Sequence, residues 1–170
     1  VNIGWIVGAS GTCYKTTDAG ATWTPQTTTI TGIIYTISMV DANIGWLGGA
    51  SGVVNITTDG GTTWTPQTSG MGTSVIYGSH AVDAVTAYIV GASGKVSKTT
   101  DGGTTWNILP VPSLVGTSTL YTVHFRDANY GAVAGALGKV ISTIDGGATW
   151  MYENTSGSTI YGIRVAQSGT

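Results

Sequence analysis

The stretch that decides the fold is Thr57-Thr58-Asp59-Gly60-Gly61-Thr62-Thr63-Trp64, one of four versions of the same box along the chain. The pattern Thr-x-Asp-x-Gly-x-Thr-Trp recurs over residues 16–23, 99–106 and 143–150. Its tryptophans, at positions 23, 64, 106 and 150, are 41, 42 and 44 residues apart. A fixed period of this length indicates an array of stacked or radially arranged units.

Each unit has the same internal order of short, β-branched or aromatic segments separated by turns rich in Gly, Asp and Asn. In the second unit the pattern predicts strands over residues 34–40, 44–49, 53–57 and 63–67, and no segment has a helical period. A four-stranded antiparallel meander of this length is the size of one β-propeller blade. The sequence therefore predicts an all-β propeller of four four-stranded blades, occupying residues 1–170 as a single domain.

The two ends of the chain match different strands of a blade. Residues 2–5 match a second strand, and residues 160–165 match a first strand. We therefore expect the C-terminal strand to complete the N-terminal blade, which would remove exposed sheet edges. Four arrangements fit this pattern: a four-bladed ring in one chain, an eight-bladed ring from two chains, part of a longer propeller, or a head-to-tail fibre.

The composition excludes several classes of function. The 170 residues carry a net charge of −2, and charged residues make up only 8% of them. The six basic residues are scattered singly, so we expect no nucleic-acid partner, and no apolar run approaches the ~20 residues of a transmembrane helix. The one cysteine, Cys13, is expected to be buried filler. A surface of hydroxyl and amide groups favours an extracellular or cell-surface location.

The box resembles the Asp-box, or bacterial neuraminidase repeat, and the wider unit over residues 120–150 is similar to repeats of the photosystem II stability and assembly factor family. The resemblance covers essentially the whole chain and implies a β-propeller fold. Related repeats occur in secreted, surface and adhesive bacterial proteins. The best-known family members help assemble photosystem II and resemble seven-bladed rings with an arginine-rich patch. This chain has only Arg126 and Arg164, so the photosystem role does not follow directly.

The residues of the box have a structural reading. Each Asp can accept backbone N–H groups across its own hairpin, the Gly two positions later allows the sharp turn, and the Trp covers the hairpin base. One carboxylate per loop does not suit calcium, so we expect no metal and no cofactor. The structural Asp-box residues are Asp18, Gly20, Trp23, Asp59, Gly61, Trp64, Asp101, Gly103, Trp106, Asp145, Gly147 and Trp150.

Catalytic residues are not expected. A sialidase site needs three arginines, and the chain has two. Glycoside hydrolysis in general needs a pair of carboxylates, but seven of the eight acidic residues occupy repeat-equivalent turns and Glu153 has no evident partner. No nucleophile-elbow Gly-x-Ser-x-Gly occurs.

Two groups of residues depart from the purely structural pattern. The first strands carry Ser38, His80, His124 and Arg164 at one repeat position, and strand alternation predicts that they share a face with Thr36 and its equivalents, opposite Tyr35 and Ile37. They are candidates for an anion or metal site in the propeller channel, or else solvated or hydrogen-bonded residues. The segment Leu109, Pro110, Val111 and Pro112 is either a binding loop or a crossover packed over the blade edge.

The function expected from these observations is a non-catalytic extracellular or cell-surface structural and binding module, with a protein partner or self-association through its ends. A lectin is one alternative, with Trp5 and Trp46 stacking on sugars, although Tyr88 and Ala132 break that pattern. An assembly factor of the photosystem-associated type is the other.

Overall fold

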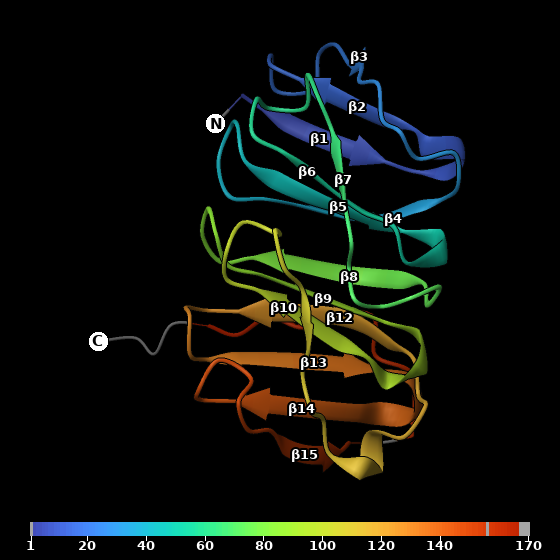
Figure 1. Ribbon diagram of the computed structural model, residues 1–170, viewed down its shortest axis with the longest axis vertical. Coiled ribbons are helices and arrows are strands. Elements are labelled where there is room, and N and C mark those ends of the chain that lie inside the picture. The colour runs from blue at the N-terminus through green and yellow to red at the C-terminus, as the bar shows by residue number, and fades with distance from the viewer. Residues whose placement is uncertain (1, 156, 167–170) are drawn as a thin grey trace.

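The chain forms four antiparallel sheets that follow one another in a row (Figure 1), and the computed structural model describes residues 2–155 and 157–166. Strands adjacent in sequence are adjacent in each sheet, so every sheet is a meander. Blade 1 contains β1 (Gly4–Val7), β2 (Cys13–Thr16) and β3 (Thr24–Pro25), and blade 2 contains β4 (Ile34–Met39), β5 (Gly45–Gly49), β6 (Val54–Thr57) and β7 (Thr65–Gln67). Blade 3 contains β8 (Ile76–Ala81), β9 (Ala87–Gly91), β10 (Val96–Thr99) and β11 (Asn107–Ile108), and blade 4 contains β12 (Leu120–Phe125), β13 (Gly131–Gly135), β14 (Lys139–Thr143) and β15 (Met151–Asn154). The prediction of an all-β protein built from propeller blades is confirmed.

Tight turns join the second and third strands of every blade. These are short 3-10 turns at η1 (Ala9–Gly11), η2 (Ala50–Gly52), η3 (Ala92–Gly94) and η5 (Ala136–Gly138). The middle residue of each has a positive φ, between 55° and 62°, and the glycine that follows also lies in the left-handed region. Glycine adopts this conformation without steric cost, which explains its recurrence at the third turn position. A further turn, η4 (Ser113–Val115), lies on the crossover between blades 3 and 4.

The hydrophobic core lies between the blades. Leu47 packs with Cys13 and Trp64 between blades 1 and 2, whereas Trp46 packs with Trp106 between blades 2 and 3. Tyr88 stacks on Phe125 between blades 3 and 4, with ring centroids 3.6 Å apart. Blades 2 and 3 thus bury both faces against their neighbours, whereas blades 1 and 4 each bury one. Cys13 is buried as the sequence indicated, and burial raises the pKa of its thiol to about 11.

The structure differs from the prediction at the first blade, which has three strands because the C-terminal segment does not complete it. We call residues 157–166 the tail. In the tail, the Ile160 N–H donates to the Gly135 carbonyl at 2.9 Å, as the Ile34 N–H donates to the Gly8 carbonyl at 2.9 Å. The tail therefore lies against blade 4 in the place that β4 takes against blade 1. Because the blades form a row, blades 1 and 4 stand at its opposite ends (Figure 1), and the tail does not reach β1.

Among the described residues, none of the helical segments has the length and apolar character needed to cross a lipid bilayer.

Candidate functional site

The first strands of blades 2, 3 and 4 lie side by side and form the inner edge of the row. Each of them pairs with the second strand of its blade through a register shift at its tyrosine. The shift falls between Ile34 and Thr36 in β4, and at the equivalent positions of β8 and β12. A bulge leaves one extra residue outside the ladder and redirects its side chain. The tyrosine of each inner strand is that extra residue.

The three bulged tyrosines and Tyr161 of the tail form a continuous row of aromatic rings, which we call the tyrosine row: Tyr35, Tyr77, Tyr121 and Tyr161. The ring centroids of successive members are 5.0, 5.1 and 5.0 Å apart. Tyr35 is 42% exposed. The pKa of Tyr77 is raised, first by desolvation and then by the nearby Tyr35 and Tyr121. The rings at the two ends of the row are the most exposed, since Tyr161 is 74% exposed.

Sequence reasoning did not identify the tyrosine row as a site. Strict alternation places Tyr35 on one face with Ile37, opposite Thr36, but the bulge interrupts the alternation at this point. The available signal was the recurrence of a tyrosine at one position in every unit. A bulge is not visible in a pattern of apolar and polar residues, because it depends on the pairing partner.

The polar row predicted for the channel lies between neighbouring inner strands. Ser38 Oγ accepts the Ala81 N–H at 2.8 Å, and His124 Nδ1 accepts the Val165 N–H at 3.2 Å. Each acceptor thus bonds to the next inner strand along the row. The same repeat position therefore contributes to the contact between blades.

The two histidines lie together, with ring centroids 4.5 Å apart. Desolvation lowers the pKa of His80 to about 4, with smaller contributions from His124 and from the exposed Arg164. The pKa of His124 is also lowered, first by burial and then by the nearby Arg164. Both rings are therefore neutral at pH 7. The described residues contain no group of three or more His, Cys, Asp and Glu side chains that could hold a metal ion. An anion or metal site at Ser38, His80, His124 and Arg164 stays a prediction.

The Asp-boxes form closed hydrogen-bond networks within their own hairpins. In blade 2, Asp59 accepts the Thr63 N–H at 2.9 Å and the Thr63 hydroxyl at 2.7 Å. The Thr57 hydroxyl donates to Asp59 and accepts the Gly61 N–H at 2.7 Å. The role of this first threonine was not anticipated from the sequence. Hydrogen bonds from Thr22 and from Thr149 lower the pKa of Asp18 and of Asp145, in each case to about 2.

The acidic residues of the loops between the first and second strands are also held locally. Asp41, Asp83 and Asp127 each accept two backbone N–H groups of their own turn. Seven of the eight acidic residues are thereby occupied in turns.

Side chains from blades 1, 2 and 3 each reach the box of the next blade. The acceptor is the carbonyl of the first box glycine: Lys15 Nζ donates to Gly60 at 2.8 Å, and Gln67 Nε2 donates to Gly102 at 2.8 Å. At the next interface Tyr88 Oη donates to the Gly146 carbonyl at 2.9 Å, together with the Lys98 ammonium group. The two remaining lysines donate to main-chain carbonyls of the crossovers. All four lysines therefore serve the packing of the blades.

The proline-containing crossover packs onto blades 3 and 4. Leu109 and Val111 contact the core between these blades, while Pro110 is exposed and Pro112 is half-buried. The apolar side chains on either side of Pro110 point inward, as expected for a crossover that packs over the blade edge. A role of this loop in binding stays a prediction.

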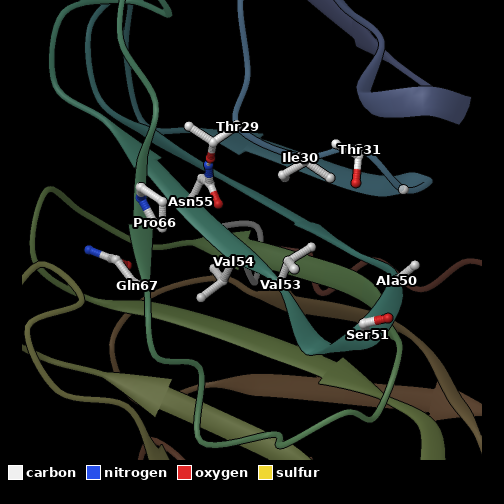
Figure 2. A pocket seen from close by; sticks show the side chains of 11 residues that line it. Thr29, Ile30, Thr31, Ala50, Ser51, Val53, Val54, Asn55, Pro66 and Gln67 are labelled. Atoms are coloured by element: carbon white, nitrogen blue, oxygen red, sulfur yellow. Dashed lines mark hydrogen bonds between the residues drawn. The ribbon is translucent and has the colours of Figure 1, made fainter.

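A hollow of about 370 Å³ lies between the crossover of blades 1 and 2 and the outer strands of blade 2 (Figure 2). The Asn55 amide points into the space between these segments and donates to the Thr29 hydroxyl at 2.8 Å. Val53, Val54 and Pro66 supply apolar walls. The one buried polar side chain in this lining, Asn55, already has a partner, which leaves little for a ligand to recognise.

Comparison with known proteins places these observations in a family. The model of the family described as photosynthesis system II assembly factor YCF48 matches residues 26–116, which is more than half of the chain. No curated protein sequence matches it.

Several solved structures share the fold. "YCF48 bound to D1 peptide" has a TM-score of 0.60 and 18% identity over 89% of this chain and 78% of that one. YCF48 from Cyanidioschyzon merolae has a TM-score of 0.73 and 22% identity over 96% of this chain and 60% of that one. An ancestral GH74 enzyme has a TM-score of 0.74 and 16% identity, but this chain spans only 22% of its length. Similarity at these low identities shows a shared propeller fold. The similarity to the GH74 enzyme covers only a small part of that enzyme.

Proposed function

Because the chain belongs to the family described as photosynthesis system II assembly factor YCF48, we propose that it is a protein-binding module of the assembly-factor type, which holds an extended polypeptide segment of its partner on the tyrosine row. The observation that carries the proposal is the unbroken spacing of four rings across three successive inner strands and the tail. Tyrosine provides large contact area at low cost in side-chain entropy, and its hydroxyl can bond main-chain groups. A polypeptide segment offers both apolar side chains for the rings and main-chain groups for the hydroxyls.

The chemistry of the surface favours a segment of low charge. Arg126 is paired with Asp127 at 3.0 Å and lies over the Tyr130 ring, and the lysines serve the blade contacts. Arg164 is the cation closest to the tyrosine row in sequence, three residues after Tyr161. The partner we propose is therefore an uncharged or weakly acidic segment.

A glycan ligand is less well supported than a polypeptide. Trp46 and Tyr88, which occupy the repeat position considered for sugar stacking, are fully buried between blades. Trp5 is half-buried, and Lys15 lies over its ring. None of the three presents an open aromatic face of the kind that stacking on a sugar requires.

The family match supports the assembly-factor reading above the extracellular structural one. The structure titled "YCF48 bound to D1 peptide" concerns a related fold with a peptide ligand, which agrees with a polypeptide partner. Catalysis is not part of the proposal, because seven of the eight acidic side chains are engaged in turns. An extracellular or cell-surface location, indicated by composition alone, remains a separate proposal that cell fractionation would test.

The test is a titration of the chain with labelled D1 peptide and with a scrambled version, followed by fluorescence anisotropy. We expect saturable binding of the D1 peptide, and about tenfold weaker binding after Tyr35→Leu combined with Tyr77→Leu, since each aromatic contact contributes ~0.5–1.5 kcal/mol. Tyr130→Leu is the matched control, because Tyr130 is 43% exposed but lies outside the tyrosine row. Absence of binding, or an equal loss in the control, would overturn the proposal.

A further inference from the structure

A lysine stands at the start of the third strand in blades 3 and 4, and in both blades it is bonded to the crossover that precedes the blade. Lys95 Nζ donates to the Met71 carbonyl at 2.8 Å, and Lys139 Nζ donates to the Val115 carbonyl at 2.8 Å. Both lysines are half-buried. Their aliphatic stems therefore fill space between the crossover and the third strand while the ammonium group ties the two together.

Blade 2 has a valine at this position. Val53 follows the turn η2 as Lys95 follows η3 and Lys139 follows η5. Its side chain is too short to reach the crossover carbonyls, and the other two lysines are engaged elsewhere, because Lys15 and Lys98 donate to carbonyls of the boxes. The crossover that precedes blade 2 thus receives no lysine ammonium group from this chain.

The hollow of about 370 Å³ in blade 2 lies between the same two segments that the lysines join in blades 3 and 4. Figure 2 shows Val53 on one side of this space, with Ile30 and Thr31 of the crossover on the other. The five heavy atoms of a four-carbon ammonium chain need roughly 150 Å³, at about 30 Å³ for each water-sized group. The hollow can therefore hold such a chain, and its lining has no charged side chain that would repel it.

The main-chain acceptor in this hollow is the carbonyl of Thr29. In the two later crossovers, the carbonyl that follows the lysine acceptor belongs to Gly72 or Gly116 and crowds the turn glycine of the preceding blade. In the crossover before blade 2, the carbonyl that crowds the turn glycine, Gly11, belongs to Ile30. The carbonyl one residue earlier, that of Thr29, therefore holds the position of the lysine acceptors.

The rest of the lining suits an aliphatic stem. Asn55 Nδ2 donates to the Thr29 hydroxyl at 2.8 Å, so the buried amide fixes the crossover against β6 and is occupied in doing so. The side chains thus offer a ligand little polar recognition, and the main-chain carbonyl carries it instead. Val53, Val54 and Pro66 form the apolar walls along which methylene groups can pack.

We infer that the hollow in blade 2 binds a primary ammonium group on a straight aliphatic chain, which donates to the Thr29 carbonyl as Lys95 donates to the Met71 carbonyl. An ammonium group brings three donors and no acceptor, which matches a carbonyl oxygen. This chemistry is shared by the lysine side chain of a polypeptide and by a free aliphatic amine. The inference does not depend on the proposed function, because the hollow lies on the outer strands and the tyrosine row on the inner strands.

The first experiment titrates n-butylammonium chloride into the ¹⁵N-labelled chain at pH 7, with sodium chloride at the same concentrations as the reference. We expect saturable amide shifts at residues 29–32 and 53–55, with half-saturation on the order of 10 mM for a ligand of this size. The alcohol n-butanol keeps the stem but has a single donor, so it should bind about fivefold more weakly or less well still. Shifts that do not saturate, or equal binding of n-butanol, would overturn the inference.

The variant Val53→Lys supplies the ammonium group from the chain itself and should weaken n-butylammonium binding by about tenfold or more, since its own side chain fills the hollow. Val85→Lys is the matched control, because it makes the same exchange at a residue that is 49% exposed on a loop of blade 3. Binding should be unchanged in this control. A urea midpoint of Val53→Lys at or above that of the unmodified chain shows that the fold is kept. Undiminished binding to Val53→Lys, or an equal loss in Val85→Lys, would contradict the assignment.

Two larger probes distinguish the sources of the ammonium group. Nα-acetyl-lysine methylamide presents the side chain as a polypeptide does, and 1,4-diaminobutane represents a free amine. Tighter binding of the first assigns the hollow to a lysine of a protein partner, and tighter binding of the second assigns it to a free amine. Failure of both to shift residues 29–32 and 53–55 would overturn the inference.

Discussion

The amide of Gln67 joins two tryptophans and a box turn across the contact between blades 2 and 3. Its Oε1 accepts the indole N–H groups of Trp46 at 3.2 Å and Trp106 at 3.1 Å, and its Nε2 donates to the Gly102 carbonyl at 2.8 Å. Gln26 holds the same repeat position in blade 1 and is also half-buried. Its Nε2 donates only to the carbonyls of Thr24 and Pro25 in its own segment, and its Oε1, which lies beside Gly61 of the next box, accepts no hydrogen bond within the described residues. The two glutamines therefore form a matched pair.

The substitution Gln67→Leu replaces the amide with an apolar side chain of similar size and removes all three hydrogen bonds. Each bond contributes ~1 kcal/mol net, and the fully buried Trp46 is left with an unpaired indole N–H, which adds to the cost. We therefore expect Gln67→Leu to lower the free energy of unfolding by about 3 kcal/mol. Gln26→Leu removes two local bonds of 3.4 and 3.2 Å, and should cost less than about 1 kcal/mol.

Equilibrium unfolding in urea at pH 7, followed by tryptophan fluorescence, measures both values. With a denaturant slope of ~2 kcal/mol per molar urea, the midpoint of Gln67→Leu should lie about 1 M below that of Gln26→Leu. Gln67→Glu keeps the acceptor for the two indoles but loses the donor to Gly102, and should fall between them. Equal midpoints for Gln67→Leu and Gln26→Leu would refute the view that this amide holds the two blades together.

Three further predictions concern acid titration and backbone packing. The pKa values of Asp18 and Asp145 are held at about 2, below the ordinary 3.8. Their contribution to stability is therefore complete above pH 4 and disappears as the pH falls toward 2. The urea unfolding midpoint should decline across this range, and it should decline less steeply for Asp145→Asn. His80 is kept neutral, with its pKa at about 4 against the ordinary 6.5, so stability should also fall between pH 6.5 and pH 4, and His80→Gln should abolish that part of the slope in the same measurement. Gly91→Ala would push a Cβ atom into the Val75 carbonyl and should lower the free energy of unfolding by ~1–3 kcal/mol. Gly8→Ala, where an added Cβ lies no closer than 4.0 Å to a neighbouring atom, should lower it by much less, and similar thermal melts of the two variants would contradict this.

The blades could be predicted from the sequence because the information lies in local repeats. The box beginning at Thr57, the glycine at the third position of each tight turn and the even lengths of the segments all act within one hairpin. Local hydrogen bonds and turn conformations depend on neighbours in sequence, so periodicity was sufficient to locate them.

The site and the ends of the row depend on partners far away in sequence. The redirection of Tyr35 depends on how β4 pairs with β5, and the use of Ser38 as an acceptor depends on the position of Ala81 in the next blade. The tail has the sequence of an inner strand, but that sequence does not say which blade it joins. Its bonds to Gly135 and His124 decide this, and they place it beside blade 4.

The central claim is that a polypeptide binds across the inner strands, and hydrogen–deuterium exchange with and without D1 peptide tests it most directly. The account predicts that bound peptide slows exchange in β4, β8 and β12, where the tyrosine row crosses the blades, and leaves the crossover over residues 109–116 unchanged. Protection confined to that crossover or to the outer strands, with the inner strands unaffected, would contradict the account.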